Sequence, residues 1–184
     1  MNTKKFEKYE SEARLNELCP AVTLKRAGLT TDMTICDIGA GTGAFAFPAA
    51  KITEDMVYAL EISDDMLEIL ENRKKERGID NLVIKKVQGT QLPLEDSSCD
   101  MVIMVTVLHE LEETETILNE IRRILKPDGK LMIVEFHKRG TPMGPSISHR
   151  ISVEETEDLC HRSGYITTDQ FCLGENFYSI IFQK

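Results

Sequence analysis

The feature that most constrains the fold of this chain is a regular alternation of strand-like and helix-like apolar patterns. Short apolar runs predict strands at residues 34–37, 56–61, 82–87, 101–106 and 130–137. Between them, apolar residues recur at helical spacing over residues 44–51, 64–77 and 114–125. Such alternation is typical of βαβ units, and it predicts a parallel sheet covered by helices on both faces.

Polar residues and glycines mark the ends of these segments. Ser63 stands before two aspartates and is expected to be the N-cap of the helix over 64–77, which Gly78 is expected to end. The tetrapeptide "KPDG" at 126–129 predicts a turn between the third helix and the fifth strand. These signals agree with the boundaries expected from the apolar pattern.

The pattern changes after residue 137. A Gly/Pro-rich loop at 139–146 precedes a helix expected over 152–162, with Ser152 as its N-cap. The last strand-like runs, "YITTDQFCL" and "NFYSIIFQK", are separated by Gly174 and Glu175, a spacing typical of a hairpin. The expected fold class is therefore α/β, a three-layer, doubly wound and mostly parallel sheet with an antiparallel C-terminal strand.

Length and charge limit the classes of function. A chain of 184 residues suits one domain, and we expect a single domain over 1–184, with a helical segment over 1–28 and a core over 34–184. The net charge of −9 argues against nucleic acid or an anionic membrane as the main partner. The sequence contains no apolar run as long as a signal peptide or a membrane span, so we expect a cytoplasmic protein without membrane insertion.

The cysteines give no sign of a metal site. There are five of them, and they include no C-x-x-C pair, so we expect neither a bound metal nor a disulfide. Cys36 and Cys99 lie in strand-like runs and are expected to be small buried side chains.

A glycine-rich segment, "GAGTG" at 39–43, lies between the first expected strand and the first expected helix. In open parallel sheets, ligands bind at the carboxyl ends of strands, where this segment is placed. Gly39, Gly41 and Gly43 allow the backbone to approach a ligand closely. Residues 39–44 also fit G-x-G-x-x-A, so the glycines by themselves are compatible with a dinucleotide as well.

Two carboxylates narrow the choice of ligand. Glu61 ends the second expected strand, where a carboxylate can accept both hydroxyls of an adenosine ribose; the alternative is an exposed acid that caps the helix from Asp64. Asp37 precedes the first glycine, where it would repel a pyrophosphate and attract an ammonium group beside a sulfonium. The alternative for Asp37 is a side chain that caps loop amides. Together these carboxylates favour S-adenosylmethionine over a dinucleotide.

Four ordered segments carry a family resemblance: "ICDIGAGTGAFAFPAAK", "VYALEISDDMLEIL", "LPLEDSSCDMVIMVTVLHEL" and "IRRILKPDGKLMIVEF". They resemble the successive motifs of class I S-adenosylmethionine-dependent methyltransferases, and most of all the ubiquinone/menaquinone-biosynthesis-type branch. The resemblance runs from about residue 35 to the C-terminus. It implies a seven-stranded sheet whose last strand is antiparallel, which agrees with the hairpin. It also implies S-adenosyl-L-methionine as the methyl donor and S-adenosyl-L-homocysteine as a product.

The resemblance also implies a set of cofactor contacts. Asp37 and the glycine loop would hold the methionyl end, Glu61 the ribose, and Ile62 and Met66 the adenine. The residues expected to bind the cofactor are Asp37, Gly39, Ala40, Gly41, Gly43, Glu61, Ile62, Met66, Gln88, Gly89 and Val105.

One of these contacts departs from the pattern of the family. Relatives usually have an acidic residue and then a small one before "LP", whereas this chain reads "VQGTQLP". Gln88 therefore stands at the acidic position, and its carbonyl could accept the hydrogen bond from the adenine amino group. Val105 and Thr106, at the end of the fourth strand, would lie beneath the cofactor.

The chemistry of methyl transfer does not demand a catalytic triad. Displacement at a sulfonium has a good leaving group, so positioning and exclusion of water can suffice, and a base is needed only for a protonated nucleophile. His109 and Glu135 are the candidate catalytic residues near the ends of the fourth and fifth strands, with Glu110 and His137 as further candidates. The alternative for His109, whose position is often histidine in the family, is that it only shapes the site.

The expected acceptor side begins at His137 and continues into the following loop. His137, His149 and Arg150 are the candidate substrate-binding residues: His137 lies near the carboxyl end of the fifth strand, and the segment with His149 and Arg150 resembles Gly-Pro…His-Arg-Ile-Ser segments of relatives. Arg150 could meet an anionic substrate, or it could pair with an acid of the helix that follows and fix the loop.

The segment before the first strand is expected to be helical. In relatives it often closes over the cofactor, and Phe6, Tyr9 and Arg14 could then contribute to the site; the alternative is ordinary packing.

These observations predict a methyltransferase that acts on a small molecule by in-line displacement. The chain has no large insertion between the expected strands, which favours a small-molecule acceptor over a protein or nucleic acid. The main alternative is a regulatory or subunit protein that binds S-adenosylmethionine without turnover. A nicotinamide oxidoreductase is disfavoured, because no catalytic domain follows the nucleotide-binding segment.

Overall fold

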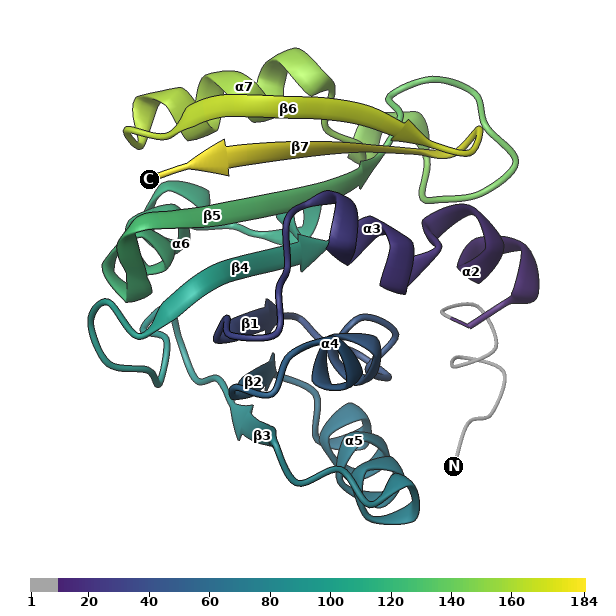
Figure 1. Ribbon diagram of the computed structural model, residues 1–184. Coiled ribbons are helices and arrows are strands. Elements are labelled where there is room, and N and C mark those ends of the chain that lie inside the picture. Colours follow the sequence, from purple (N-terminus) through teal and green to yellow (C-terminus); the bar gives the residue numbers. More distant parts are fainter. Residues whose placement is uncertain (1–9) are drawn as a thin grey trace.

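The computed structural model describes residues 10–184, and its strands form one seven-stranded sheet in the order β3-β2-β1-β4-β5-β7-β6 (Figure 1). The strands are β1 (Ile35–Ile38), β2 (Val57–Glu61), β3 (Leu82–Lys86), β4 (Cys99–Val105), β5 (Leu125–Phe136), β6 (Ile166–Leu173) and β7 (Phe177–Gln183). The first five pair in parallel, and β7 runs antiparallel to both β5 and β6. The expected fold class is thus confirmed.

Helices cover both faces of this sheet. They are α2 (Glu12–Leu18), α3 (Pro20–Arg26), α4 (Ala46–Ile52), α5 (Asp64–Arg77), α6 (Thr114–Ile124) and α7 (Val153–Arg162), with single turns η1 (Leu108–Glu110) and η2 (Ile147–His149). Buried side chains of α2, α3, α4 and α5 pack in one apolar layer, and those of α6 and α7 in the other. Phe6 and Tyr9, expected to contribute to the site, lie outside the described residues.

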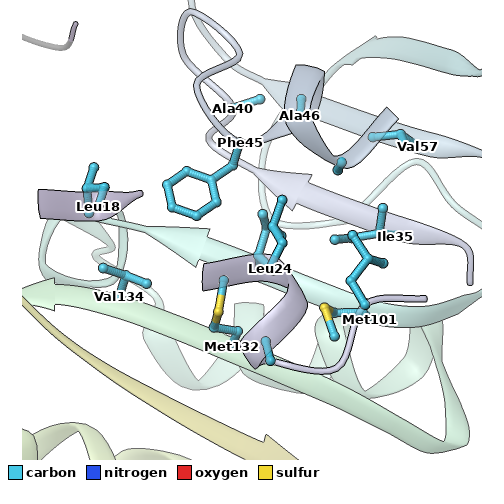
Figure 2. Close-up of a cluster of buried hydrophobic side chains, with 14 of the residues drawn as sticks. Leu18, Leu24, Ile35, Ala40, Phe45, Ala46, Val57, Met101, Met132 and Val134 are labelled. Atoms are coloured by element: carbon cyan, nitrogen blue, oxygen red, sulfur yellow. The ribbon is translucent and has the colours of Figure 1, made fainter. Parts of the chain in front are cut away.

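The central strand β4 explains why the sheet is buried on both faces. Met101 and Ile103 point into one layer, while Val102 and Met104 point into the other, because side chains alternate along a strand. Figure 2 shows the first layer, in which Leu24 of α3 packs with Ile35 and other apolar side chains of the central strands. Such a continuous apolar run is what a parallel sheet between two helical layers requires.

The prediction of a turn at 126–129 that separates the third helix from the fifth strand is wrong. Strand β5 begins at Leu125, directly after α6. Its register with β4 shifts from Cys99 opposite Leu125 to Met101 opposite Lys130, so "KPDG" forms an irregularity inside the strand. Lys126 Nζ lies 2.7 Å from an oxygen of Asp100, which anchors this irregularity to the neighbouring strand.

The other boundaries follow the sequence closely. Ser152 caps α7 in a reciprocal pair with Glu155, as expected. Ser63 stands at the N-cap position of α5, but its side chain makes no capping hydrogen bond, so that part of the expectation is wrong. Cys36 and Cys99 are both buried, as expected.

Candidate cofactor and active site

A cavity of about 350 Å³ opens at the carboxyl ends of β1, β2 and β4. Its walls are mostly apolar, with the carboxylate of Glu61 among the few charged groups. Residues expected to bind the cofactor account for much of the lining, namely Gly39, Gly41, Glu61, Ile62, Met66, Gly89 and Val105. A cavity of this size at the edge of a doubly wound sheet can hold a nucleoside-sized ligand.

The glycine loop is shaped by backbone angles that side chains disfavour. Gly39, Gly41 and Gly43 have φ values of 67°, 55° and 87°. At Gly43 a Cβ atom would lie 2.4 Å from Phe47, so this glycine serves the packing of α4. A Cβ atom at Gly41 would lie 3.9 Å from its nearest neighbour, the carbonyl oxygen of Gly39. The loop therefore leaves open space on the side that lines the cavity.

Glu61 is held in place by three backbone amides. Its Oε2 accepts from the Gly41 amide at 2.8 Å, and its Oε1 accepts from the amides of Ile62 and Ser63 at 2.8 and 3.0 Å. The side chain is buried, so the alternative of an exposed acid is wrong, although the carboxylate does meet amides next to α5. Since each carboxylate oxygen has two lone pairs, Oε2 keeps acceptor capacity for a ligand hydroxyl.

Asp37 lines a second, smaller cavity of about 50 Å³ beside the first. Gly39 and Val105 line both cavities, and Ala40 lines the smaller one. Burial, and then the charge of Glu61, raise the pKa of Asp37 to about 8, against a smaller opposing effect of the Ala46 amide. A cation beside this carboxyl group would therefore favour its ionised form.

His109 and Glu135 form a buried pair. The His109 Nδ1 atom lies 2.9 and 2.8 Å from the two carboxylate oxygens of Glu135, and the His109 amide donates to the same carboxylate at 3.2 Å. Burial by itself lowers the pKa of His109, but the hydrogen bond and charge of Glu135 outweigh it, so the pKa is raised. Two candidates, one from the turn η1 after β4 and one from β5, thus form one imidazole–carboxylate unit.

Comparison with known proteins decides the family. A family model described as a methyltransferase domain matches residues 36–133. The chain belongs to this methyltransferase family. The ubiquinone/menaquinone biosynthesis C-methyltransferase UbiE of Bordetella avium (strain 197N) is 32% identical over 136 residues, which cover 73% of this chain and 53% of the relative. The demethylmenaquinone methyltransferase of Lactococcus lactis subsp. lactis (strain IL1403) is 33% identical over 65% of this chain and 48% of the relative.

The chain spans about half the length of the curated methyltransferases it matches. A solved structure, a SAM-dependent methyltransferase from Aquifex aeolicus, has a TM-score of 0.93 at 25% identity, covering 100% of this chain and 98% of that one. The [4+2]-cyclase SpnF has a TM-score of 0.80 at 18% identity, covering 91% of this chain and 80% of that one, and shows the fold alone. The expected resemblance to class I methyltransferases is confirmed.

Some residues predicted to bind the cofactor lie away from the larger cavity or at its rim. Gln88 is exposed and is not part of the lining of either cavity described above, so its contact with adenine stays a prediction. Gly43 faces Phe47 rather than the cavity. Ile62 lies at the rim, 71% exposed.

Arg150 is buried and forms hydrogen bonds within the loop that precedes it, instead of lying on an open surface. Its guanidinium donates to the carbonyls of Pro145, His137, Arg139 and Met143 and to the hydroxyl of Thr141, at 2.6–2.9 Å. This arrangement favours the alternative in which Arg150 fixes the loop, but through carbonyl groups instead of an acid. Every residue has a backbone carbonyl, so the sequence could not indicate that carbonyls of this loop would point toward Arg150.

The two histidines of the predicted acceptor side have different surroundings. His149 lines an open trough of about 580 Å³, which His109 also lines. The His137 ring packs against Tyr178, and burial lowers its pKa, as does the charge of Arg139. His149 can therefore meet a ligand in the trough, whereas His137 packs within the fold.

The helix α2 contacts the end of β4 and the start of β7 in ways that the sequence only partly indicated. Arg14 donates from Nη2 to the hydroxyl of Thr106 at 2.9 Å, at the end of β4. Glu17 accepts from the backbone amide and the side-chain amide of Asn176 at 3.0 and 2.6 Å. Nothing in the sequence pointed to Asn176, the second of two polar residues that follow the hairpin glycine Gly174.

Two further findings concern residues 10–184. Over this range no helix combines the length and apolar character needed to cross a bilayer. No three side chains of His, Cys, Asp or Glu in the described part of the chain are grouped as ligands for a metal ion.

Proposed function

We propose that this chain transfers the methyl group of S-adenosylmethionine to a small-molecule acceptor by in-line displacement. The observation that carries the proposal is the pair of buried carboxylates, Asp37 and Glu61, on either side of the glycine loop. A pyrophosphate would be repelled by Glu61 and would oppose ionisation of Asp37, whereas a sulfonium cofactor with an ammonium group is attracted by Glu61 and favours the ionised form of Asp37. The residues present therefore fit this cofactor.

The chain's own residues supply binding and orientation. Glu61 receives the ribose hydroxyls with the acceptor capacity left on Oε2, and Asp37 receives the ammonium group. The apolar walls of the larger cavity, including Met66 and Leu111, receive the adenine and exclude water. When bound, the cofactor supplies an electrophilic methyl group with a good leaving group.

His109 is the general base for an acceptor that carries a proton. Because its Nδ1 faces the Glu135 carboxylate, Nδ1 carries the hydrogen and Nε2 carries the lone pair. Glu135 fixes this tautomer and stabilises the imidazolium that forms when Nε2 takes a proton. Glu135 is therefore a positioning residue rather than a base.

The acceptor we infer is a hydroxylated aromatic ring of the quinone-precursor type, methylated at carbon. Two of the relatives are named for C-methylation in quinone biosynthesis and for demethylmenaquinone. Removal of a proton from a ring hydroxyl by His109 would make the ring carbon nucleophilic, and once methylated that carbon would release its own proton to solvent as the ring regains aromaticity. Phe136 lies edge-on to His109 with 6.2 Å between ring centroids, so the imidazole packs against an aromatic ring.

A two-part experiment tests the function. Calorimetric titration with S-adenosylhomocysteine and NAD separates the cofactor classes, and we expect binding of the first alone. Incubation with labelled S-adenosylmethionine and a panel of quinols, phenols and amines then tests turnover. Carbon methylation of a quinol supports the proposal in full, and methylation of another small molecule corrects the acceptor. Cofactor binding with no product from the panel or from a metabolite extract would favour a non-catalytic binding protein.

A further inference from the structure

The chain changes direction directly after β4, at Thr106. This residue has a φ of 56°, in the left-handed region that β-branched residues rarely adopt. Its amide still continues the pairing of β4 with β5 and donates to the Val134 carbonyl at 2.7 Å. A costly backbone conformation persists only where its surroundings favour it, and such residues gather at functional sites. The contacts around Thr106 therefore indicate what this change of direction does.

The change of direction places η1 across the carboxyl end of β4, between its two neighbouring strands. Val107 packs so closely on Gly39, which follows β1, that a Cβ atom at Gly39 would lie 2.5 Å from the Val107 side chain. Two residues later, His109 meets Glu135 of β5, on the other side of β4. The segment after Thr106 therefore reaches from the glycine loop to the candidate base.

This segment also contributes to both compartments of the site. Val107 and Glu110 line the cofactor cavity, whereas Leu108 and His109 line the open trough. Leu111 lines both. Because η1 carries side chains for both compartments, a different chain direction at its start would move the base relative to the cofactor.

A hydrogen bond from helix α2 holds Thr106 in its left-handed conformation. The Thr106 hydroxyl accepts from Arg14 Nη2 at 2.9 Å, and the charge of the guanidinium strengthens this bond. If φ at Thr106 became negative, its side chain and the residue after it would both change direction. The bond to Arg14 and the packing of Val107 on Gly39 would then be lost together, so both oppose relaxation of the backbone.

We propose that Thr106 is a positioning residue for the general base: its left-handed backbone directs η1 so that His109 meets Glu135. The bond from Arg14 to the Thr106 hydroxyl keeps the backbone in that conformation. The inference rests on the proposed function, because it takes His109 as the base. It gives α2, which precedes the segment matched by the family model, a part in the geometry of proton transfer.

The variant Thr106→Val removes the hydroxyl and keeps the shape of the side chain. At saturating S-adenosylmethionine we expect kcat to fall by about 10- to 100-fold, because the base is misplaced. The apparent pKa of the rate should move downward, because His109 loses part of its contact with Glu135. Glu135, Glu110 and Arg14 act on the charge of His109, and none of them is replaced in this variant. The shift therefore reports a change of geometry.

Two further measurements distinguish positioning from a general loss of stability. Thr106→Asn should have a rate at least about fivefold above that of Thr106→Val, because asparagine tolerates the left-handed conformation and offers a side-chain oxygen to Arg14. Proton NMR detects the His109 Nδ1 hydrogen, which the bond to Glu135 deshields, and His109→Gln identifies its signal by removing it. This signal needs no turnover, and it should weaken in Thr106→Val and persist in Thr106→Asn.

Thr53→Val, between α4 and β2, is the matched control. Thr53 is also buried, and its hydroxyl donates to the Met33 carbonyl at 2.7 Å and accepts from the Asp55 amide at 3.0 Å. It precedes β2, whereas the site lies at the other end of that strand. The same substitution at Thr53 should lower the melting temperature but leave the proton signal and the apparent pKa of the rate in place.

The proton signal and the rate distinguish the possible errors. An unchanged signal and an unchanged apparent pKa in Thr106→Val would overturn the inference, even if the melting temperature fell. If circular dichroism shows that this variant does not fold, Thr106→Gly decides. Glycine adopts either sign of φ and lacks the hydroxyl, so we expect a weakened signal, and a wild-type signal would contradict the inference. If the signal responds as expected but the wild-type protein methylates no acceptor, the proposed function fails while the positioning of His109 stands.

Discussion

The two sides of the site hold their buried carboxylates in different ways. On the cofactor side, Asp37 and Glu61 meet backbone amides, which carry no net charge, so a cationic ligand can supply the charge that favours the ionised form of Asp37. On the acceptor side, Glu135 meets the imidazole of His109, with which it can share a proton. The difference suits the two tasks, because one side must attract a fixed cation and the other must move a proton.

The largest effect on the reaction rate is expected at His109, on the acceptor side of the site. His109→Gln removes the base, so kcat should fall by about 10²- to 10⁴-fold while the affinity for S-adenosylmethionine stays within about threefold. Single-turnover kinetics and calorimetry measure the two quantities separately. His161→Gln in α7 is the control, because it removes an exposed histidine whose ring nitrogen lies 2.9 Å from the Thr167 hydroxyl oxygen. If His109→Gln weakened cofactor binding as much as it lowered the rate, His109 would be shown to act in cofactor binding, and the assignment of separate roles to the two sides would be wrong.

The same pair predicts a pH dependence of the rate. Because the pKa of His109 is raised above its ordinary 6.5, its base form is lost as pH falls through that raised value. We expect kcat to rise with pH through an apparent pKa above 6.5 in the wild-type protein. Glu135→Gln should move this apparent pKa downward, since the carboxylate that stabilises the imidazolium is gone. An unchanged profile in Glu135→Gln would contradict the positioning role.

On the cofactor side, Glu61→Ala should weaken S-adenosylmethionine and 5′-methylthioadenosine alike, by about 1.5–3 kcal/mol. The reason is that both ligands carry the ribose and both lose the same acceptor. Calorimetry of the two ligands checks this, with Glu71→Ala on the exposed face of α5 as the control. Unchanged affinity of both ligands would refute the ribose assignment.

Asp37 should make cofactor binding depend on pH. Its pKa of about 8 in the free protein means that the carboxyl group is largely protonated at neutral pH, and the cationic ligand favours the ionised form. Affinity should therefore rise by up to about tenfold per pH unit below 8 and level off above it, with release of a proton on binding. Titrations in buffers of different ionisation enthalpy detect that proton, and Asp37→Asn should abolish the dependence.

The same group affects stability with the opposite sign. An acid whose folded pKa is raised from 3.8 to about 8 binds its proton more tightly in the folded state. Its contribution to the free energy of unfolding of the ligand-free protein is therefore greatest at low pH and declines as pH rises toward 8. Asp37→Asn should remove this decline, so its melting temperature at pH 8 should exceed that of the wild type, whereas its cofactor affinity should be lower.

The smallest effect is expected at the outer edge of the cofactor side. Because Gln88 is exposed, Gln88→Ala should change the affinity for S-adenosylmethionine by less than about 0.5 kcal/mol. A loss nearer 1 kcal/mol, the ordinary value of a neutral hydrogen bond, would instead support its predicted contact with adenine.

The sequence predicted the fold and the cofactor side better than the acceptor side, for a physical reason. The alternation that buries Val102 and Ile103 on opposite faces, and the glycines that need positive φ, are local properties that a pattern reveals. The pairing of His109 with Glu135 is not local, and only its two members could be named in advance. The role of Arg150 depends on carbonyl groups that every residue carries, so no residue type indicates it.

Asn176 has a consequence for how the site opens. It bonds to Glu17 of α2, its side-chain oxygen accepts from the Met143 amide, and its carbonyl accepts from the His137 amide. With 1% of its surface exposed, it cannot replace these partners with water while the fold stays closed. Detachment of α2 therefore exposes the loop at 139–150 as well. In hydrogen exchange the two segments should behave as one cooperative unit, although more than a hundred positions separate them in the chain.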